Sequence, residues 1–304
     1  MEKKVGVILF AILFVSCVFV HGNQNSALAA MSGMQSHEHQ GMQHEHTPAG
    51  EEVLAEIKTT PENITAGIST TVVFSIWDRE GKPVEDLTIV HDRLVHVVIT
   101  SQDFSVFAHI HPDDSGPITQ EMKKTARYPV RFTFPKAGRY IIGVDFAVKG
   151  QLFSRHFPVD VAGGPRMGSL TRDLSREKRF GDLDVTFATM PERVMAGKEV
   201  MLTYLFRKNG GPVTGLEPYL SAPMHLAIIS GDLNDFIHTH GELPGMPGMA
   251  HGEHHMMMQM TVPEKFGPKI EVHVVFPRKG LYQIFGQVGY RGKVVLTSFM
   301  VEVE

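Results

Sequence analysis

The stretch that decides the fold is His96–His111, HVVITSQDFSVFAHIH, because a second copy, HLAIISGDLNDFIHTH, lies at His225–His240. The two copies are 129 residues apart throughout. Each holds an apolar, β-branched run, a Ser-x-Asp turn and a second run that ends in His-x-His. This pattern predicts two antiparallel strands joined by a tight turn, present once in each half of the chain.

The repeat extends in both directions from this stretch. Upstream, Pro61-Glu62 matches Pro191-Glu192 at an offset of 130, and downstream Phe134-Pro135 matches Phe276-Pro277 at an offset of 142. The step between offsets indicates a 13-residue insertion in the second copy. Because the register is held over about 100 residues, we interpret the chain as a tandem duplication.

Short apolar runs separated by turn signals fill the first copy and show no long helical pattern. The strands predicted there are Val53–Thr59, Thr70–Trp77, His96–Thr100, Ser105–His111, Tyr128–Phe134, Arg139–Val148 and Leu152–Val161. Seven short strands in about 110 residues predict an all-β fold, with two tandem immunoglobulin-like β-sandwich domains in the whole chain. The predicted segments are a signal peptide (1–29), a disordered His/Met-rich tail (30–50), repeat one (51–162), a linker (163–180) and repeat two (181–304), which carries a Met/His-rich insertion (243–260).

The first residues predict export. A basic start, Met1–Lys4, precedes the unbroken apolar run Val5–Val20, as in a secretory signal. Cleavage after Ala27-Leu28-Ala29 and lipoprotein processing before Cys17 are both open, and an uncleaved anchor is the alternative. The protein is therefore expected in the periplasm, at the cell surface or secreted, and at a membrane only through an N-terminal lipid or signal anchor.

The composition argues against some classes of function and points to others. The net charge is −4, and no basic stripe with interleaved aromatic residues occurs, so nucleic-acid binding is not expected. The single cysteine lies in the signal, so no disulfide is predicted in the exported part. The unusual counts are 17 histidines and 17 methionines.

Three histidines of each copy are candidate metal ligands. If the turn centres between Gln102 and Asp103, His96 lies opposite His109, and His111 shares their face. Neutral imidazole binds zinc, copper and nickel, so each triplet could hold one ion; the alternative is a structural, hydrogen-bonding group. The second triplet is His225, His238 and His240, and His273 is a weaker candidate because its counterpart is Arg131.

Two segments combine methionine with histidine, within 31–46 and within the insertion. Thioethers suit Cu(I), and imidazole suits both Cu(I) and Cu(II), so copper is the predicted ion, with zinc the alternative at the histidine triplets. An oxidation-prone, low-complexity loop is the other interpretation of the insertion. The candidate ligands there are Met246, Met249, His251, His254, His255, Met256, Met257, Met258 and Met260.

The pattern H-L-x-I-I-S-x-D-L-x-x-F-x-H-x-H, followed by F-P-x-x-G-x-Y, resembles the YtkA-like domain family. The resemblance covers His96–Gly150 and His225–Gly292. It implies an exported β-sandwich without enzymatic activity that is associated with copper handling.

The function predicted is an exported, non-enzymatic metal-binding protein that binds, buffers or delivers copper, with a metal ion and a copper-transport or envelope protein as partners. The alternative is an envelope protein-interaction module in which the histidines are structural. A metalloenzyme would need an acid or base beside the histidines, and Asp103 and Asp232 lie at turns instead. No G-x-S-x-G, Walker A or HExxH sequence occurs, so an enzyme is not predicted.

Overall fold

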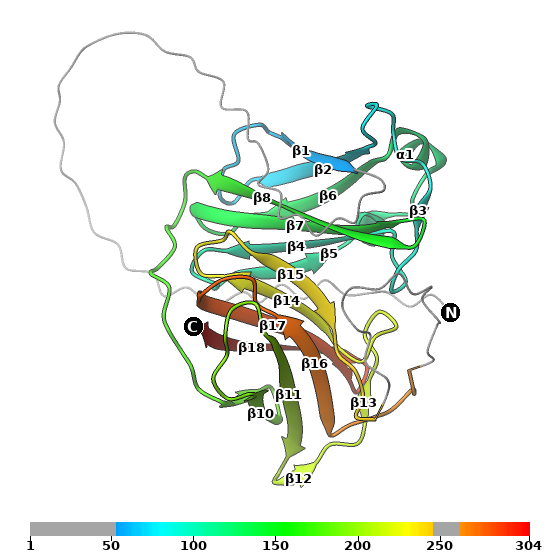
Figure 1. Cartoon of the computed structure of the whole chain (residues 1–304). Helices are drawn as coiled ribbons and strands as arrows, with labels where there is room; N and C mark the ends of the chain where they lie inside the picture. The colour runs from blue at the N-terminus through cyan, green and yellow to red at the C-terminus, as the bar shows by residue number, and fades with distance from the viewer. Residues whose placement is uncertain (1–52, 246–261) are drawn as a thin grey trace, which may run out of the picture. The chain divides into compact units, whose positions relative to one another are not determined.

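The computed structural model describes residues 53–245 and 262–304, which form two tandem immunoglobulin-like β-sandwiches (Figure 1). Both sandwiches belong to one compact unit of the chain. The predicted all-β fold is confirmed. Among the described residues no helix is long and apolar enough to cross a membrane.

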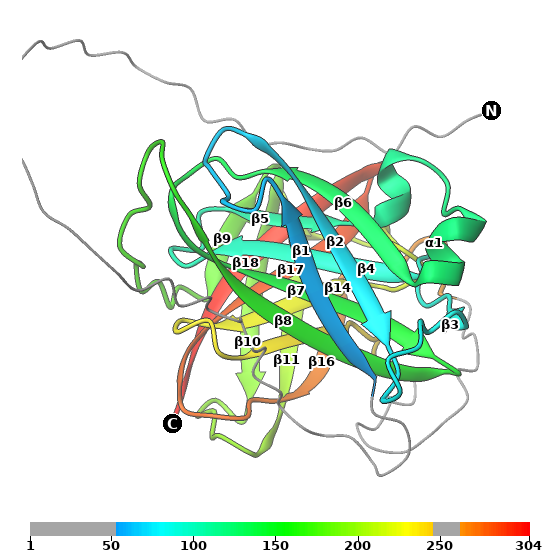
Figure 2. The same cartoon turned by 90° about the horizontal axis from the view of Figure 1, so that it is seen from above.

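In the first domain, a three-stranded sheet of order β1-β2-β6 packs on a five-stranded sheet of order β3-β7-β4-β5, in which β8 also pairs with β7. Figure 2 shows β1, β2 and β6 crossing over β4 and β7. The strands are β1 (Leu54–Thr60), β2 (Ser69–Trp77), β3 (Leu87–Thr88), β4 (Val95–Ser101), β5 (Phe107–Ile110), β6 (Arg127–Thr133), β7 (Gly138–Val148) and β8 (Gln151–Val161).

The second domain repeats this arrangement. One sheet has the order β12-β11-β10-β9 with β16 on β11, and the other has the order β13-β17-β14-β15 with β18 on β17. The strands are β9 (Glu177–Phe180), β10 (Leu183–Met190), β11 (Glu199–Lys208), β12 (Gly211–Pro212), β13 (Leu216–Glu217), β14 (His225–Ser230), β15 (Phe236–His240), β16 (Lys269–Val275), β17 (Gly280–Tyr290) and β18 (Lys293–Val303).

Each domain has its own core, and a third apolar layer lies between the domains. In β4, Val97 and Ile99 face the core of the first domain, and Val98, one residue out of phase, belongs to the layer between domains. In β14, Ile228 and Ile229 divide in the same way. Strands buried on both faces read as continuous apolar runs, which explains the unbroken VHVVIT and HLAII.

The layer between domains places β4 and β5 beside β14 and β15 (Figure 1). Phe107 stacks on Phe285 with ring centroids 4.3 Å apart. At the equivalent position, the Phe236 ring occupies the space over Gly143 that a Cβ would fill. The two sandwiches are therefore packed on each other, which the sequence prediction of tethered domains did not include.

Each of the seven strands predicted for the first copy corresponds to an observed one, within a few residues at the ends. The prediction missed β3, the 3₁₀ turn η1 (Pro112–Ser115) and the helix α1 (Gln120–Thr125), which is too short to show a helical period. Thr119 caps α1 by accepting a hydrogen bond from the Met122 amide. The predicted linker, 163–180, is wrong at its end, because β9 begins at Glu177 and pairs with β10.

Candidate metal centre

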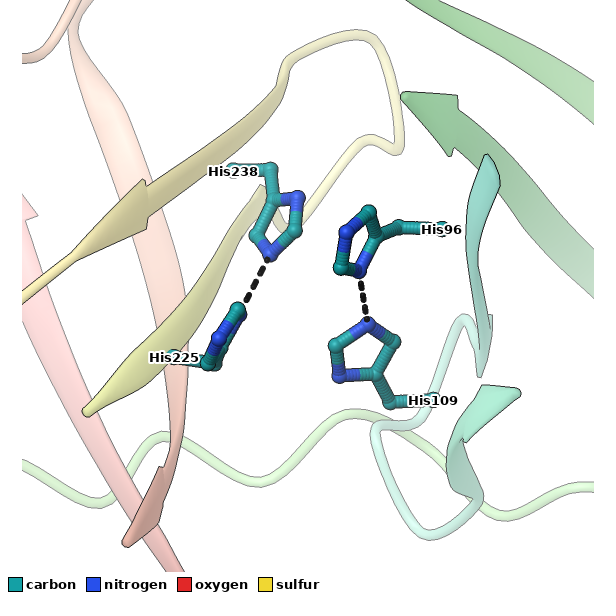
Figure 3. A group of neighbouring side chains, drawn as sticks. All are labelled: His96, His109, His225 and His238. Carbon is teal, nitrogen blue, oxygen red and sulfur yellow. Dashed lines mark hydrogen bonds between the residues drawn. The ribbon is translucent and has the colours of Figure 1, made fainter. Parts of the chain in front are cut away.

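Four histidines converge where the two domains meet, and we call them the tetrad: His96, His109, His225 and His238. Each offers a ring nitrogen, and these four atoms all lie within 4.8 Å of one another. Figure 3 shows the rings of His96 and His109 on one side, facing those of His225 and His238. Within each domain the paired nitrogens, Nδ1 of the first histidine and Nε2 of the second, are 3.2 Å and 3.4 Å apart.

The pairing of the strands corrects the predicted geometry. His225 lies opposite His240, and His109 lies opposite Val98, so the turn centres one residue later than expected and the pairing moves by two. Each turn contains a left-handed residue, Phe104 or Leu233. A shift of two preserves the face, so the three histidines of each copy still point the same way.

The outer nitrogens of the tetrad are held by hydrogen-bond acceptors. His96 Nε2 lies 3.0 Å from the Val90 carbonyl and His225 Nε2 3.2 Å from the Leu220 carbonyl. His238 Nδ1 lies 2.8 Å from the Asp145 carboxylate.

The fourth outer nitrogen, His109 Nδ1, lies 2.8 Å from Gln287 Oε1 as the amide is placed. A carbonyl or a carboxylate can only accept, so the outer nitrogens carry protons, and the inner nitrogen of a neutral ring then carries a lone pair.

The site has an approximate twofold symmetry that follows the duplication. His109 and His238 are equivalent, and each bonds to the strand of the other domain, at the equivalent positions Gln287 and Asp145. Asp92 accepts a hydrogen bond from its own equivalent, Ser221, at 2.6 Å. Two equivalent residues in contact mark where the symmetry axis passes.

Burial keeps three of these imidazoles, those of His96, His109 and His225, neutral. Burial, followed by the proximity of His238, lowers the pKa of His96 to about 2. The pKa values of His109 and His225 are also well below the usual range, with burial as the main cause. Neutral imidazole is the ligand form, so these three rings can bind a cation without first losing protons at neutral pH.

Three further histidines surround the tetrad. The ring of His111 lies 4.7 Å from that of His109, and its Nδ1 lies 3.2 Å from Asp114. The ring of His240 lies 4.5 Å from that of His225. His91, which the sequence prediction missed, stacks on His240 at 3.8 Å.

The six predicted histidines are thus brought together in one cluster, in a different grouping from the predicted one. The tetrad takes two residues from each triplet, and His111 and His240 lie outside it. Asp145 and Gln287 were also missed, because they act across the domain interface. His273 lies apart from the cluster, on β16, where it bonds to Glu199. The predicted ligands between Met246 and Met260, the tail and the signal lie outside the described residues.

Fold and site define the class: a tandem immunoglobulin-like protein with a histidine cluster buried between its two sandwiches. The chain belongs to the family described as a domain of unknown function (DUF8832), whose model matches residues 51–163 and 178–304. No curated protein matches the chain.

Several solved structures resemble the fold at low similarity. They include the Escherichia coli adhesin FdeC (14% identity, TM-score 0.23, covering 82% of this chain and 64% of that one) and invasin, a bacterial integrin-binding protein (13%, 0.21, 82% and 39%). A titin fragment, A168–A169, is another (13%, 0.21, 84% and 98%). The chain spans less than two thirds of the adhesin and invasin structures.

Proposed function

We propose that this is an exported metal-binding protein whose tetrad holds one transition-metal ion between the two sandwiches. The observation that carries the proposal is the pair of facing lone pairs on His96 and His109. His96 Nδ1 and His109 Nε2 are 3.2 Å apart, and the outer nitrogen of each ring already donates to an acceptor. Two lone pairs at this distance repel unless a cation lies between them.

The spacing within each pair of nitrogens fits two ligands of a tetrahedral ion. Zinc binds histidine nitrogen at about 2.0–2.1 Å, so two ligands of a tetrahedron are separated by roughly 3.3–3.4 Å. The nitrogen pairs of the tetrad, at 3.2 Å and 3.4 Å, match this separation. Four imidazole nitrogens suit ions of the zinc and copper class.

The surroundings of the tetrad are those of a ligand set. Metal-bound histidines usually donate their second N–H to a carboxylate or carbonyl, which fixes the ring and its tautomer. Asp145, Val90 and Leu220 do this for three of the four rings. Asp145 also supplies a negative charge beside the four ligands.

The methionine- and histidine-rich segments of the sequence favour copper as the ion in the cell, so we propose copper binding, buffering or delivery outside the cytoplasm. The resemblance to the YtkA-like family points the same way. Both arguments rest on sequence, whereas the tetrad supports a metal of the zinc and copper class without choosing between them.

The experiment compares the full chain with the double variant His109→Gln/His238→Gln, in which each domain loses one inner ligand. Zn²⁺ and Cu⁺ are offered separately against a chromophoric chelator. The wild type is expected to retain one ion that the double variant loses. The fall in affinity should exceed the roughly 10–100-fold that is typical when a residue hydrogen-bonded to a ligand is replaced. The matched control is His273→Gln, because His273 lies outside the cluster.

Equal affinity of the double variant and the control would contradict the proposal. Should the double variant fail to fold, the single variant His109→Gln serves the same purpose. Glutamine there keeps a neutral, polar side chain near Gln287 and removes the imidazole ligand.

A second candidate is an envelope protein-interaction module with structural histidines. The observation that favours it is that His109 and His238 each bond to the opposite domain, so the rings help to join the sandwiches without any ion. In that case, Zn²⁺ would leave the unfolding temperature of the wild type unchanged. A bound ion instead stabilises the native state by about 2.7 kcal/mol at 100 times the dissociation constant.

A further inference from the structure

A second group of histidines lies beside the tetrad, on one side only. His91, His225 and His240 each offer a ring nitrogen, and these atoms are within 4.8 Å of one another. His225 stands edge-on to both of the other rings, with centroids 5.1 Å from His91 and 4.5 Å from His240. Imidazoles that approach from two directions can point their nitrogens at a common ion.

The Nε2 atom of His240 is buried and has no hydrogen-bond partner within the described part of the chain. A buried polar atom without a partner costs about 1–3 kcal/mol, so such an atom needs an explanation. A bound ion would supply the missing partner. His111, the equivalent of His240, has the same unpartnered Nε2, so both copies present a lone pair beside the tetrad.

The turns on the two sides of the cluster differ at the position of His91. The turn at Val90–Arg93 and its equivalent at Tyr219–Ala222 have the same backbone hydrogen bonds. His91 has φ 47° and its equivalent, Leu220, has φ 48°. The first turn therefore carries an imidazole to His240, and the second carries an aliphatic side chain at the equivalent position.

A cavity of about 120 Å³ reaches this group. His91 and His240 line it together with His96 and His238 of the tetrad and the carboxylate of Asp145. The cavity gives room for a small ligand beside the group and extends to the tetrad, and Asp145 makes it favourable for a cation.

We propose that His91, His225 and His240 form a second transition-metal site, with three imidazole ligands and a fourth position open to the cavity. Three histidines with an open position are the ligand set of an exchangeable or reactive ion, whereas four close the coordination sphere. The inference rests on the proposed function, because it assumes that the cluster binds metal. It adds that the cluster binds two ions. His225 belongs to both groups, so it bridges the ions as an imidazolate that has released its Nε2 proton and its bond to the Leu220 carbonyl, and the second ion therefore binds more weakly.

The test uses the full chain in three forms: wild type, His91→Leu and Leu220→His. His91→Leu installs the residue that the equivalent turn already carries, so the backbone accommodates it. Crystals soaked in Zn²⁺ are measured by anomalous scattering at the zinc edge. Two peaks are expected in the wild type, at the tetrad and beside His240.

In His91→Leu, the peak beside His240 should disappear and the tetrad peak should remain, and zinc bound in solution should fall by one ion per chain. In Leu220→His, a third peak should appear beside His111. Unfolding temperatures in chelator confirm that all three forms are folded.

Two wild-type peaks that persist in His91→Leu, or a single peak at the tetrad in every form, would overturn the second site and leave the proposed function standing. A wild type without any peak in the cluster would overturn both. Absence of the third peak in a folded Leu220→His chain would contradict the claim that residue 91 decides which side binds.

Discussion

The two halves of the cluster are equivalent in the tetrad and different around it. In each domain one histidine of the tetrad lies on β4 or β14 and the other on β5 or β15. The paired nitrogens are 3.2 Å apart in the first domain and 3.4 Å apart in the second. Around them, His91 corresponds to Leu220 and Asp145 to Gln287. The geometry of the tetrad is the same in both copies despite these differences, which indicates that the tetrad is the site that the two copies share. The residues around it make the two sides chemically different.

The largest effect is expected where the two domains pack. Phe285 stacks on Phe107, whereas the equivalent contact sets Phe236 over Gly143. Phe285→Ala should lower the free energy of unfolding by about 3–5 kcal/mol, because it opens a cavity in the layer between domains. Gly143→Ala should cost about 1–3 kcal/mol, because its Cβ would overlap the Phe236 ring.

Chemical denaturation followed by fluorescence and circular dichroism measures both variants. An exposed aliphatic position, Leu152→Ala, is the control. Changes within about 0.5 kcal/mol in both variants, the range of an ordinary surface substitution, would show that the sandwiches do not stabilise each other.

The next effect concerns Asp145 and Gln287, which accept hydrogen bonds from the outer nitrogens of the equivalent histidines His238 and His109. Asp145→Asn should weaken zinc binding by roughly 10–100-fold, because it removes a charged acceptor and with it the fixed ring orientation. Gln287→Leu should weaken it less, because the bond that it removes is neutral. Competition against a chelator gives both values, and a larger loss in Gln287→Leu would reverse the ranking of the two sides.

The smallest effect concerns pH. Burial and the nearby His238 lower the pKa of His91 from 6.5 to about 4. Below pH 6.5 the unfolded chain therefore binds a proton that the folded chain does not, so stability falls as the pH falls and levels off below about pH 4. His91→Leu removes this contribution and should reduce the loss of stability between pH 7.5 and 5.5 by about 1 kcal/mol.

Unfolding curves in chelator at several pH values measure this difference. Leu220→Ala is the control at the equivalent turn and should lose stability with pH as the wild type does. A pH dependence of His91→Leu that is identical to the wild type would show that His91 is protonated as easily in the folded chain as in the unfolded one.

The sequence predicted the strands and the shared face of the histidines, because both depend on a period of two along the chain. It could not predict which histidines share an ion. That grouping depends on the packing of one sandwich on the other, and the only local sign was the unbroken apolar run around Val98. His91 was out of reach for another reason: its role depends on a left-handed turn that brings it to the opposite domain.

The central claim is that the first ion bound by the chain is held by four imidazoles from two domains. X-ray absorption at the zinc edge, on full-length protein carrying one equivalent of Zn²⁺, tests it most directly. The account predicts four nitrogen ligands at about 2.0–2.1 Å with the outer-shell scattering of imidazole rings. Sulfur among the ligands, or fewer than four imidazoles, would contradict it and move the first ion away from the tetrad.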